Sequence, residues 1–229
     1  LEFRRVLFRS KKELTYNLLN LLESGRVTDD FIPSYAQISF IIDYKRAQYI
    51  KQDQNKNYFD NDQFYQDLGV IPMELVDKSE CPNIPLDCNV LRSTLEIPAL
   101  LRLDNRLALK ISAIDKQSRF TIILPERTPF LGNTKYNQIG IKTYWLNNRI
   151  YIPETYDIKA INVRGILQDP NKAKSFICNG SACFTDDMEY PITTDMYDLI
   201  VKDVTKNEFV FLLPKNTDQE NDTQNKPQE

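Results

Sequence analysis

Histidine is absent from these 229 residues, and only six of them are glycine. The lack of histidine excludes Ser-His-Asp and Cys-His nucleophilic pairs, together with every metal site that uses a histidine ligand. The scarcity of glycine argues against glycine-rich loops that bind phosphate. No apolar run approaches the roughly 20 residues of a membrane-spanning helix. We therefore expect no enzyme activity, no cofactor and no contact with a membrane.

The chain opens with LEFRRVLFRS, which corresponds codon by codon to a common sequencing adapter read as protein. We interpret residues 1–10 as a translated adapter artefact, the alternative being a natural basic segment, and exclude them from the fold. Because this segment carries a net charge of +2, the formal charge of −3 becomes −5 without it. An acidic chain is a poor nonspecific ligand for nucleic acid.

Residues 11–55 are predicted to form a helical hairpin. A first helix over residues 11–24 is expected, with one apolar face made of Leu14, Leu18, Leu21 and Leu22. A second helix runs from Ser34 to about Asn55. Ser34 and Gln37 have the spacing of a capping box, which marks the start of this second helix. The shared face of the second helix carries Tyr35, Ile38, Ile42 and Tyr49.

Residues 56–213 are predicted to be β-rich and to end in a helix that starts near Thr194, within the same compact domain as the hairpin. A short helix is expected at Asp62–Leu68, with Gly69 as its end. Strands follow, and the Asn147-Asn148 pair predicts a tight hairpin between two of them. The predicted strands are 73–77, 91–97, 107–114, 120–124, 140–146, 149–153 and 158–166. Residues 214–229 are strongly polar and predicted to be a disordered tail, so the fold class is α+β with a mostly antiparallel β region.

Four cysteines occur as two pairs, Cys81 with Cys88 and Cys178 with Cys183. A Cys₄ zinc site is one interpretation, although only the second pair has a spacing typical of structural zinc sites. A disulfide is another interpretation, although nothing in the sequence indicates an oxidising compartment. The interpretation we favour is four reduced thiols near turns, and therefore no metal.

Two further motifs have both a functional and a structural interpretation. The acidic cluster Asp186, Asp187 and Glu189 could bind a divalent cation or supply paired carboxylates, but it could equally be a solvated face before the last helix. Arg127 lies in PERTPFLGN, beside two prolines and ahead of Phe130. This stiff segment is either a turn that anchors Phe130 in the core or a contact loop for a partner protein.

Several segments together resemble structural proteins of tailed phages. The stretch NLLESGRVTDDFIPSYAQISFIIDYKRAQYIKQD is similar to the N-terminal helical hairpin of phage head–tail connector proteins. QDLGVIPMELVDKSEC, PERTPFLGN, INVRGILQDP and CFTDDMEYPI follow in the order found in a structural protein of crAss-like phages. Each motif is weak alone, and the shared order over residues 14 to 205 carries the resemblance.

The resemblance implies a virion component of the neck or tail, either a ring protein or a head-to-tail adaptor between portal and tail. Its expected partners are copies of itself, the portal protein and neighbouring neck or tail proteins, with incidental proximity to the DNA. Before assembly the protein would reside in the bacterial host cytoplasm. The family supplies no catalytic residues, and a zinc-stabilised interaction module remains the alternative. The candidate partner-interface residues are Ile38, Ile42, Arg46, Tyr49, Arg127 and Phe130.

Overall fold

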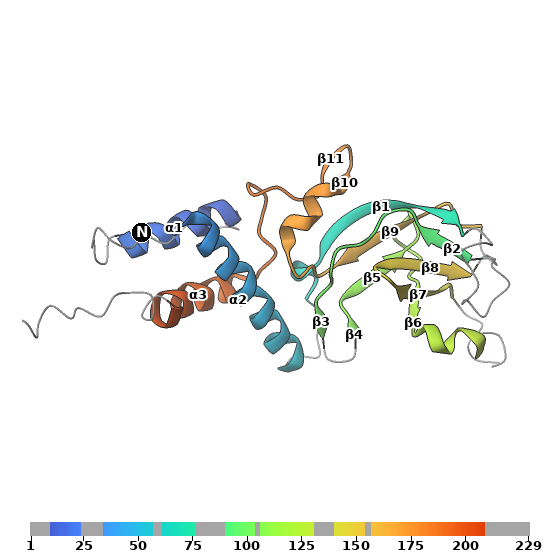
Figure 1. The fold of residues 1–229 in the computed structure, drawn as a ribbon, viewed down its shortest axis with the longest axis horizontal. Helices are drawn as coiled ribbons and strands as arrows, with labels where there is room; N and C mark the ends of the chain where they lie inside the picture. Colours follow the sequence, from blue (N-terminus) through green and yellow to red (C-terminus); the bar gives the residue numbers. More distant parts are fainter. Residues whose placement is uncertain are drawn as a thin grey trace, which may run out of the picture.

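The computed structural model describes residues 10–23, 34–56, 61–76, 90–103, 106–130, 140–153 and 157–208. Helices gather at one end of the molecule and a curled sheet forms the other end (Figure 1). The three α-helices are α1 (Lys11–Glu23), α2 (Tyr35–Lys56) and α3 (Thr194–Asp203). All three agree closely with the predicted helices, and the α+β class is confirmed.

The sequence signals at the starts of α2 and α3 are satisfied as hydrogen bonds. The Gln37 N–H donates to Ser34 Oγ at 3.3 Å, and the Ser34 N–H donates to Gln37 Oε1 at 2.9 Å. This reciprocal pair is the predicted capping box, which satisfies two backbone donors at the helix start. In α3 the cap is Thr193, whose Oγ1 accepts from the Met196 N–H at 3.3 Å.

Replacing Ser34 by alanine is expected to lower the free energy of unfolding by about 1 kcal/mol, because the Gln37 N–H loses its acceptor. Urea unfolding followed by circular dichroism measures this change. Gln48→Ala is the matched control, because Gln48 is an exposed residue in the middle of the same helix. A Ser34 variant as stable as the control would mean that the cap does not hold the start of α2.

Seven strands form one sheet in the order β5-β9-β1-β2-β8-β7-β6. Every pairing is antiparallel except that of β6 with β7. The β7–β8 turn is the predicted one, and Asn147 and Asn148 both have positive φ, as a two-residue turn of this type requires. The strands are β1 (Gln66–Leu75), β2 (Val90–Ser93), β5 (Leu109–Ser112), β6 (Thr121–Ile123), β7 (Lys142–Leu146), β8 (Arg149–Pro153) and β9 (Ala160–Gly165).

The sheet curls so far that its two outer strands meet at one end, making a partly closed barrel (Figure 1). Ser112 at the end of β5 pairs with Arg119 just before β6, and the Phe120 N–H donates to the Ile111 carbonyl at 2.9 Å. The remaining short elements are β3 (Arg102–Leu103), β4 (Arg106–Leu107), β10 (Ile177–Cys178), β11 (Ser181–Ala182), η1 (Asp62–Phe64), η3 (Pro125–Phe130), η4 (Pro170–Ser175) and η5 (Val204–Glu208).

The predicted helix over Asp62–Leu68 is wrong beyond its first turn. A single 3₁₀ turn covers Asp62–Phe64, and β1 then begins at Gln66, well before the predicted start at Met73. Gly69 does not end a helix but lies in β1, where the pairing with β9 shifts register between Asp67 and Val70. Its φ of +73° is the conformation that glycine allows at such a bulge.

The apolar core is continuous from the helices into the barrel. Leu14 and Leu18 of α1 belong to the same buried cluster as Ile161 and Val163 of β9. Leu21, which we had placed on the apolar face of α1, is instead 52% exposed. The helices and the β-rich region therefore share one apolar core. Within the described ranges, no helix has the length and apolar character needed to cross a membrane.

Candidate functional site

Arg46 lies fully buried in the middle of α2 and binds three backbone carbonyls. Its Nε donates to Pro191 O at 3.0 Å, its Nη1 to Leu167 O at 2.9 Å and its Nη2 to Phe64 O at 3.4 Å. These carbonyls belong to the segment before α3, the segment after β9 and the turn η1. One side chain therefore joins the helical end to three parts of the chain that are distant in sequence.

Asp43 supplies the negative charge beside Arg46. Its carboxylate binds Lys11 Nζ at 2.6 Å and accepts a hydrogen bond from the Tyr190 hydroxyl at 2.6 Å. The Arg46 guanidinium also lies 5.7 Å from the centre of the Tyr190 ring. Burial, together with the charge of Asp43, raises the pKa of Tyr190 well above its ordinary value, so this phenol stays protonated as a donor.

Burial lowers the pKa of Arg46, while the charges of neighbouring groups oppose that shift. An arginine remains charged even so, because its ordinary pKa is far above physiological pH. Lys11, Asp43, Arg46 and Tyr190 thus form a mutually satisfied polar cluster inside the protein, which we call the Arg46 cluster. A buried charge of this kind is tolerated only when its donors are hydrogen-bonded.

Three of the predicted interface residues belong to the core of this chain. Ile38, Ile42 and Arg46 have no exposed surface, so their assignment to a partner interface is corrected. The physical reason is that this face of α2 is already covered by the chain itself. Tyr49 is half-buried, and burial, followed by its hydrogen bond to the carboxylate of Asp203 in α3, raises its pKa.

The opposite face of α2 carries aromatic side chains that the sequence analysis did not single out. Phe40 is 71% exposed and Tyr44 is 60% exposed, one helical turn apart. Arg127 is also exposed, in η3 at the far end of the barrel, where its N–H donates to Leu124 O at 3.0 Å. The side chain of Phe130 lies outside the described residues, so its predicted anchoring role stays a prediction.

Two of the four cysteines are joined as a disulfide. Cys178, the last residue of β10, is bonded to Cys183, which directly follows β11. Our preference for reduced thiols is therefore wrong for this pair. Their sulfurs are also not available as zinc ligands in this state. Cys81 and Cys88 lie outside the described residues.

The acidic cluster ahead of α3 is engaged by lysines. Asp186 lies 2.8 Å from Lys174 Nζ, and Asp187 lies 3.6 Å from Lys12 Nζ. These residues border a groove of about 520 Å³ between α1 and the β10–β11 hairpin, whose walls include Tyr16. Across the described part of the chain, no group of three or more potential ligand side chains is placed to hold a metal ion.

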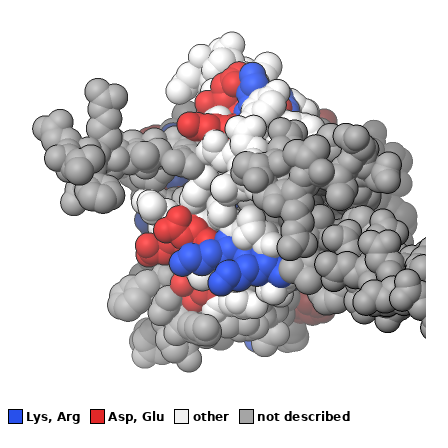
Figure 2. Space-filling model, turned by 90° about the vertical axis from the view of Figure 1, so that its left-hand side faces the viewer, with Lys and Arg blue, Asp and Glu red and all other residues white. Residues whose placement is uncertain are grey.

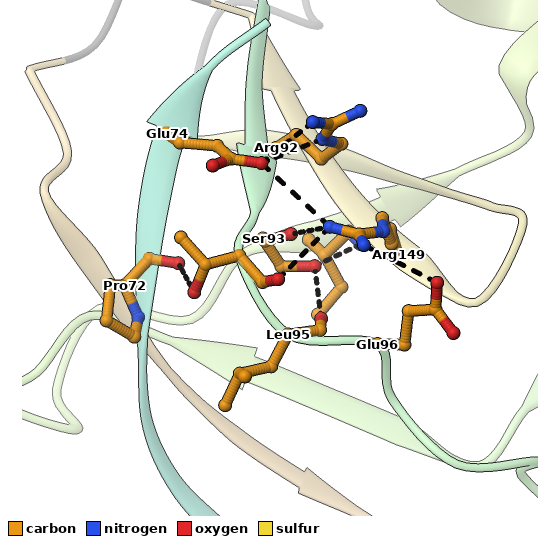
Figure 3. Close-up of polar contacts among 9 residues, drawn as sticks. Pro72, Glu74, Arg92, Ser93, Leu95, Glu96 and Arg149 are labelled. Atoms are coloured by element: carbon orange, nitrogen blue, oxygen red, sulfur yellow. Dashed lines mark hydrogen bonds and ion pairs between the residues drawn. The ribbon is translucent and has the colours of Figure 1, made fainter.

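A second charged network lies on the barrel and is shown in Figure 3. Glu74 of β1 binds the guanidinium of Arg92 at 2.8 Å, directly across the β1–β2 pairing. Arg149 Nη1 donates to the carbonyls of Ser93 and Thr94 at 3.0 and 3.1 Å. These contacts fasten the segment after β2 against β8, so we interpret the network as structural.

The described residues thus form interlocking structural contacts and expose aromatic side chains on α2. A family model for phage tail ring protein 2 of crAss-like phages matches residues 13–228. The chain belongs to this family. No curated protein matches it. The predicted resemblance to a crAss-like phage structural protein is thereby confirmed.

Membership in the phage tail ring protein 2 family identifies the chain as a structural protein of the virion. The match begins at residue 13, just after the ten residues that we interpret as adapter sequence. It continues to residue 228, so it includes the polar segment that we predicted to be a tail. That segment lies outside the described residues.

Proposed function

We propose that copies of this chain assemble into a closed ring in the neck of the particle, and that the ring joins the portal to the tail without any catalytic activity. The observation that carries this proposal is the family match over almost the whole chain. The protein would act as a homo-oligomer bound to the portal and to neighbouring neck or tail proteins. It would be held in the host cytoplasm until the particle assembles.

The described structure supports a mechanical rather than a chemical role. Two of the three carboxylates that we considered as metal ligands or catalytic groups, Asp187 and Asp186, form ion pairs with Lys12 and Lys174. The Arg46 cluster and the network of Glu74, Arg92 and Arg149 on the barrel fasten separate segments to one another, as a mechanical role requires. The zinc-module alternative is weakened, because two of its four proposed ligands form a disulfide.

Native mass spectrometry tests the proposal. We expect the chain to give a closed oligomer, or to give one on mixing with the portal protein of the same phage, in a complex of fixed stoichiometry. A monomer that binds zinc and ignores the portal would contradict the adaptor role. A ring that forms but does not bind the portal would retain the family function and overturn only the portal contact.

A further inference from the structure

Between Ala36 and Gln48 the outward face of α2 is uncharged and aromatic, although 27% of the whole chain is charged. This face, which we call the α2 aromatic face, consists of Ala36, Gln37, Phe40, Tyr44 and Gln48, all of them exposed. Large aromatic side chains that remain exposed in a single chain typically mark a site of interaction with another protein.

The charged residues on either side of Tyr44 are directed away from this face. Asp43 belongs to the Arg46 cluster, and Lys45 binds Asp203 of α3 at 2.9 Å. Both side chains are largely buried, and they leave the surface between Phe40 and Tyr44 free of charge. Figure 2 shows the helical end of the molecule, where acidic and basic side chains form small clusters separated by uncharged side chains.

The opposite end of the molecule carries an exposed turn that presents an apolar side chain and, next to Glu126, a cationic one. Leu124 is 58% exposed and Arg127 is exposed, and the hydrogen bond from the Arg127 N–H to Leu124 O fixes the turn between them. The turn enters η3, which lies beyond β6 and β7 and far from α2 (Figure 1). We call residues 124–127 the η3 turn.

A closed ring needs two different surfaces on each copy, because each copy binds its neighbour head to tail. An elongated chain with a suitable surface at each end meets this requirement. A guanidinium placed over a phenylalanine or tyrosine ring is attracted by the negative face of the ring. Arginine and aromatic residues are also the residue types enriched at the centres of protein interfaces.

We propose that the α2 aromatic face of one copy binds the η3 turn of the next copy, with Arg127 lying over Phe40 and Tyr44 and with Leu124 packed beside them. This inference rests on the proposed ring function and specifies the surfaces that build the ring. The occupant of the aromatic face is a second copy of this chain.

Two reciprocal substitutions test the interface in the full chain. Phe40→Ala and Arg127→Glu are each expected to raise the concentration needed for half assembly by about tenfold or more, as loss of an interface hot spot does. Both residues are exposed, so the thermal unfolding midpoint of the monomer should not change. Leu199→Ala is the matched control, because Leu199 is 48% exposed on α3 at the same end of the molecule and outside the α2 aromatic face.

Photocrosslinking identifies the partner surface directly. A benzoylphenylalanine at position 40 should crosslink to residues 124–130 of another copy, and a mixture of ¹⁵N-labelled and unlabelled chains shows that the link joins two copies. Crosslinks only to another part of the chain, or only to the portal, would overturn the inference. Rings that survive both substitutions would also overturn it while leaving the ring function intact, whereas a wild-type chain that never forms rings would contradict the proposed function itself.

Discussion

Replacing Arg46 by methionine is expected to lower the free energy of unfolding by about 3–5 kcal/mol. Methionine nearly fills the volume of the lost side chain, so the main effect is not a cavity. The cost arises because the carbonyls of Phe64, Leu167 and Pro191 lose their donors, and because Asp43 loses a nearby positive charge. The methionine is easier to bury than a guanidinium, and this offsets part of the loss.

Chemical unfolding followed by circular dichroism measures this change. Lys51→Met is the matched control, because Lys51 is exposed on the same helix. Arg46→Lys keeps the charge, but lysine lacks the planar guanidinium that binds all three carbonyls. Its loss of stability should therefore lie between that of the control and that of Arg46→Met. If Arg46→Met were no less stable than the control, the Arg46 cluster would not be what joins the helices to the barrel.

Replacing Gly69 by alanine is expected to cost about 2–4 kcal/mol of stability. Two effects act together at this position. The φ of +73° strains any residue that carries a Cβ, and the added Cβ would lie 2.5 Å from the carbonyl oxygen of Ile177 in the β10–β11 hairpin. Because that oxygen belongs to the backbone, the whole hairpin must move away from β1.

Gly180→Ala separates the two effects. Gly180 has a φ of +83°, but a Cβ there would meet no atom within 4 Å. Its substitution should therefore cost only the backbone strain, about 1–2 kcal/mol. Thermal unfolding of both variants measures the difference, which reports the contact between β1 and the hairpin. Equal losses would mean that the hairpin does not press on Gly69.

Local signals in the sequence were sufficient to predict the helices and one hairpin. The capping box at Ser34 and the apolar spacing in α2 depend on residues three or four positions apart, which the sequence places side by side. The Asn147-Asn148 turn is equally local. The same spacing also indicates that Arg46 is buried. It follows Ile38 and Ile42 at intervals of four residues, on the helix face that ends at Ile50.

The features that could not be predicted depend on contacts between distant segments. The sequence pattern indicates a partner contact at Arg46, whereas its hydrogen bonds are made within the chain. No local pattern indicates these bonds, because the three acceptor carbonyls lie 18, 121 and 145 residues away. Gly69 likewise has the local pattern of a helix end. The hairpin that approaches it begins more than 100 residues later, so its neighbours in sequence give no sign of the contact. The pairing of Ser112 with Arg119 is local, but the curl that brings β5 and β6 together depends on the register of all seven strands.

The joining of β5 to β6 also limits how copies of this chain can meet. Sheets of separate molecules fuse most readily by adding strand to strand, and backbone pairing of this kind accepts almost any sequence. Here the outermost strands have only four and three residues and are tied to each other at one end. The seven-stranded sheet therefore offers crowded copies little edge backbone with which to form fibres. Contacts made through side chains, in contrast, can specify both the neighbouring copy and the angle between the two copies. In a ring of identical copies, that angle sets the diameter.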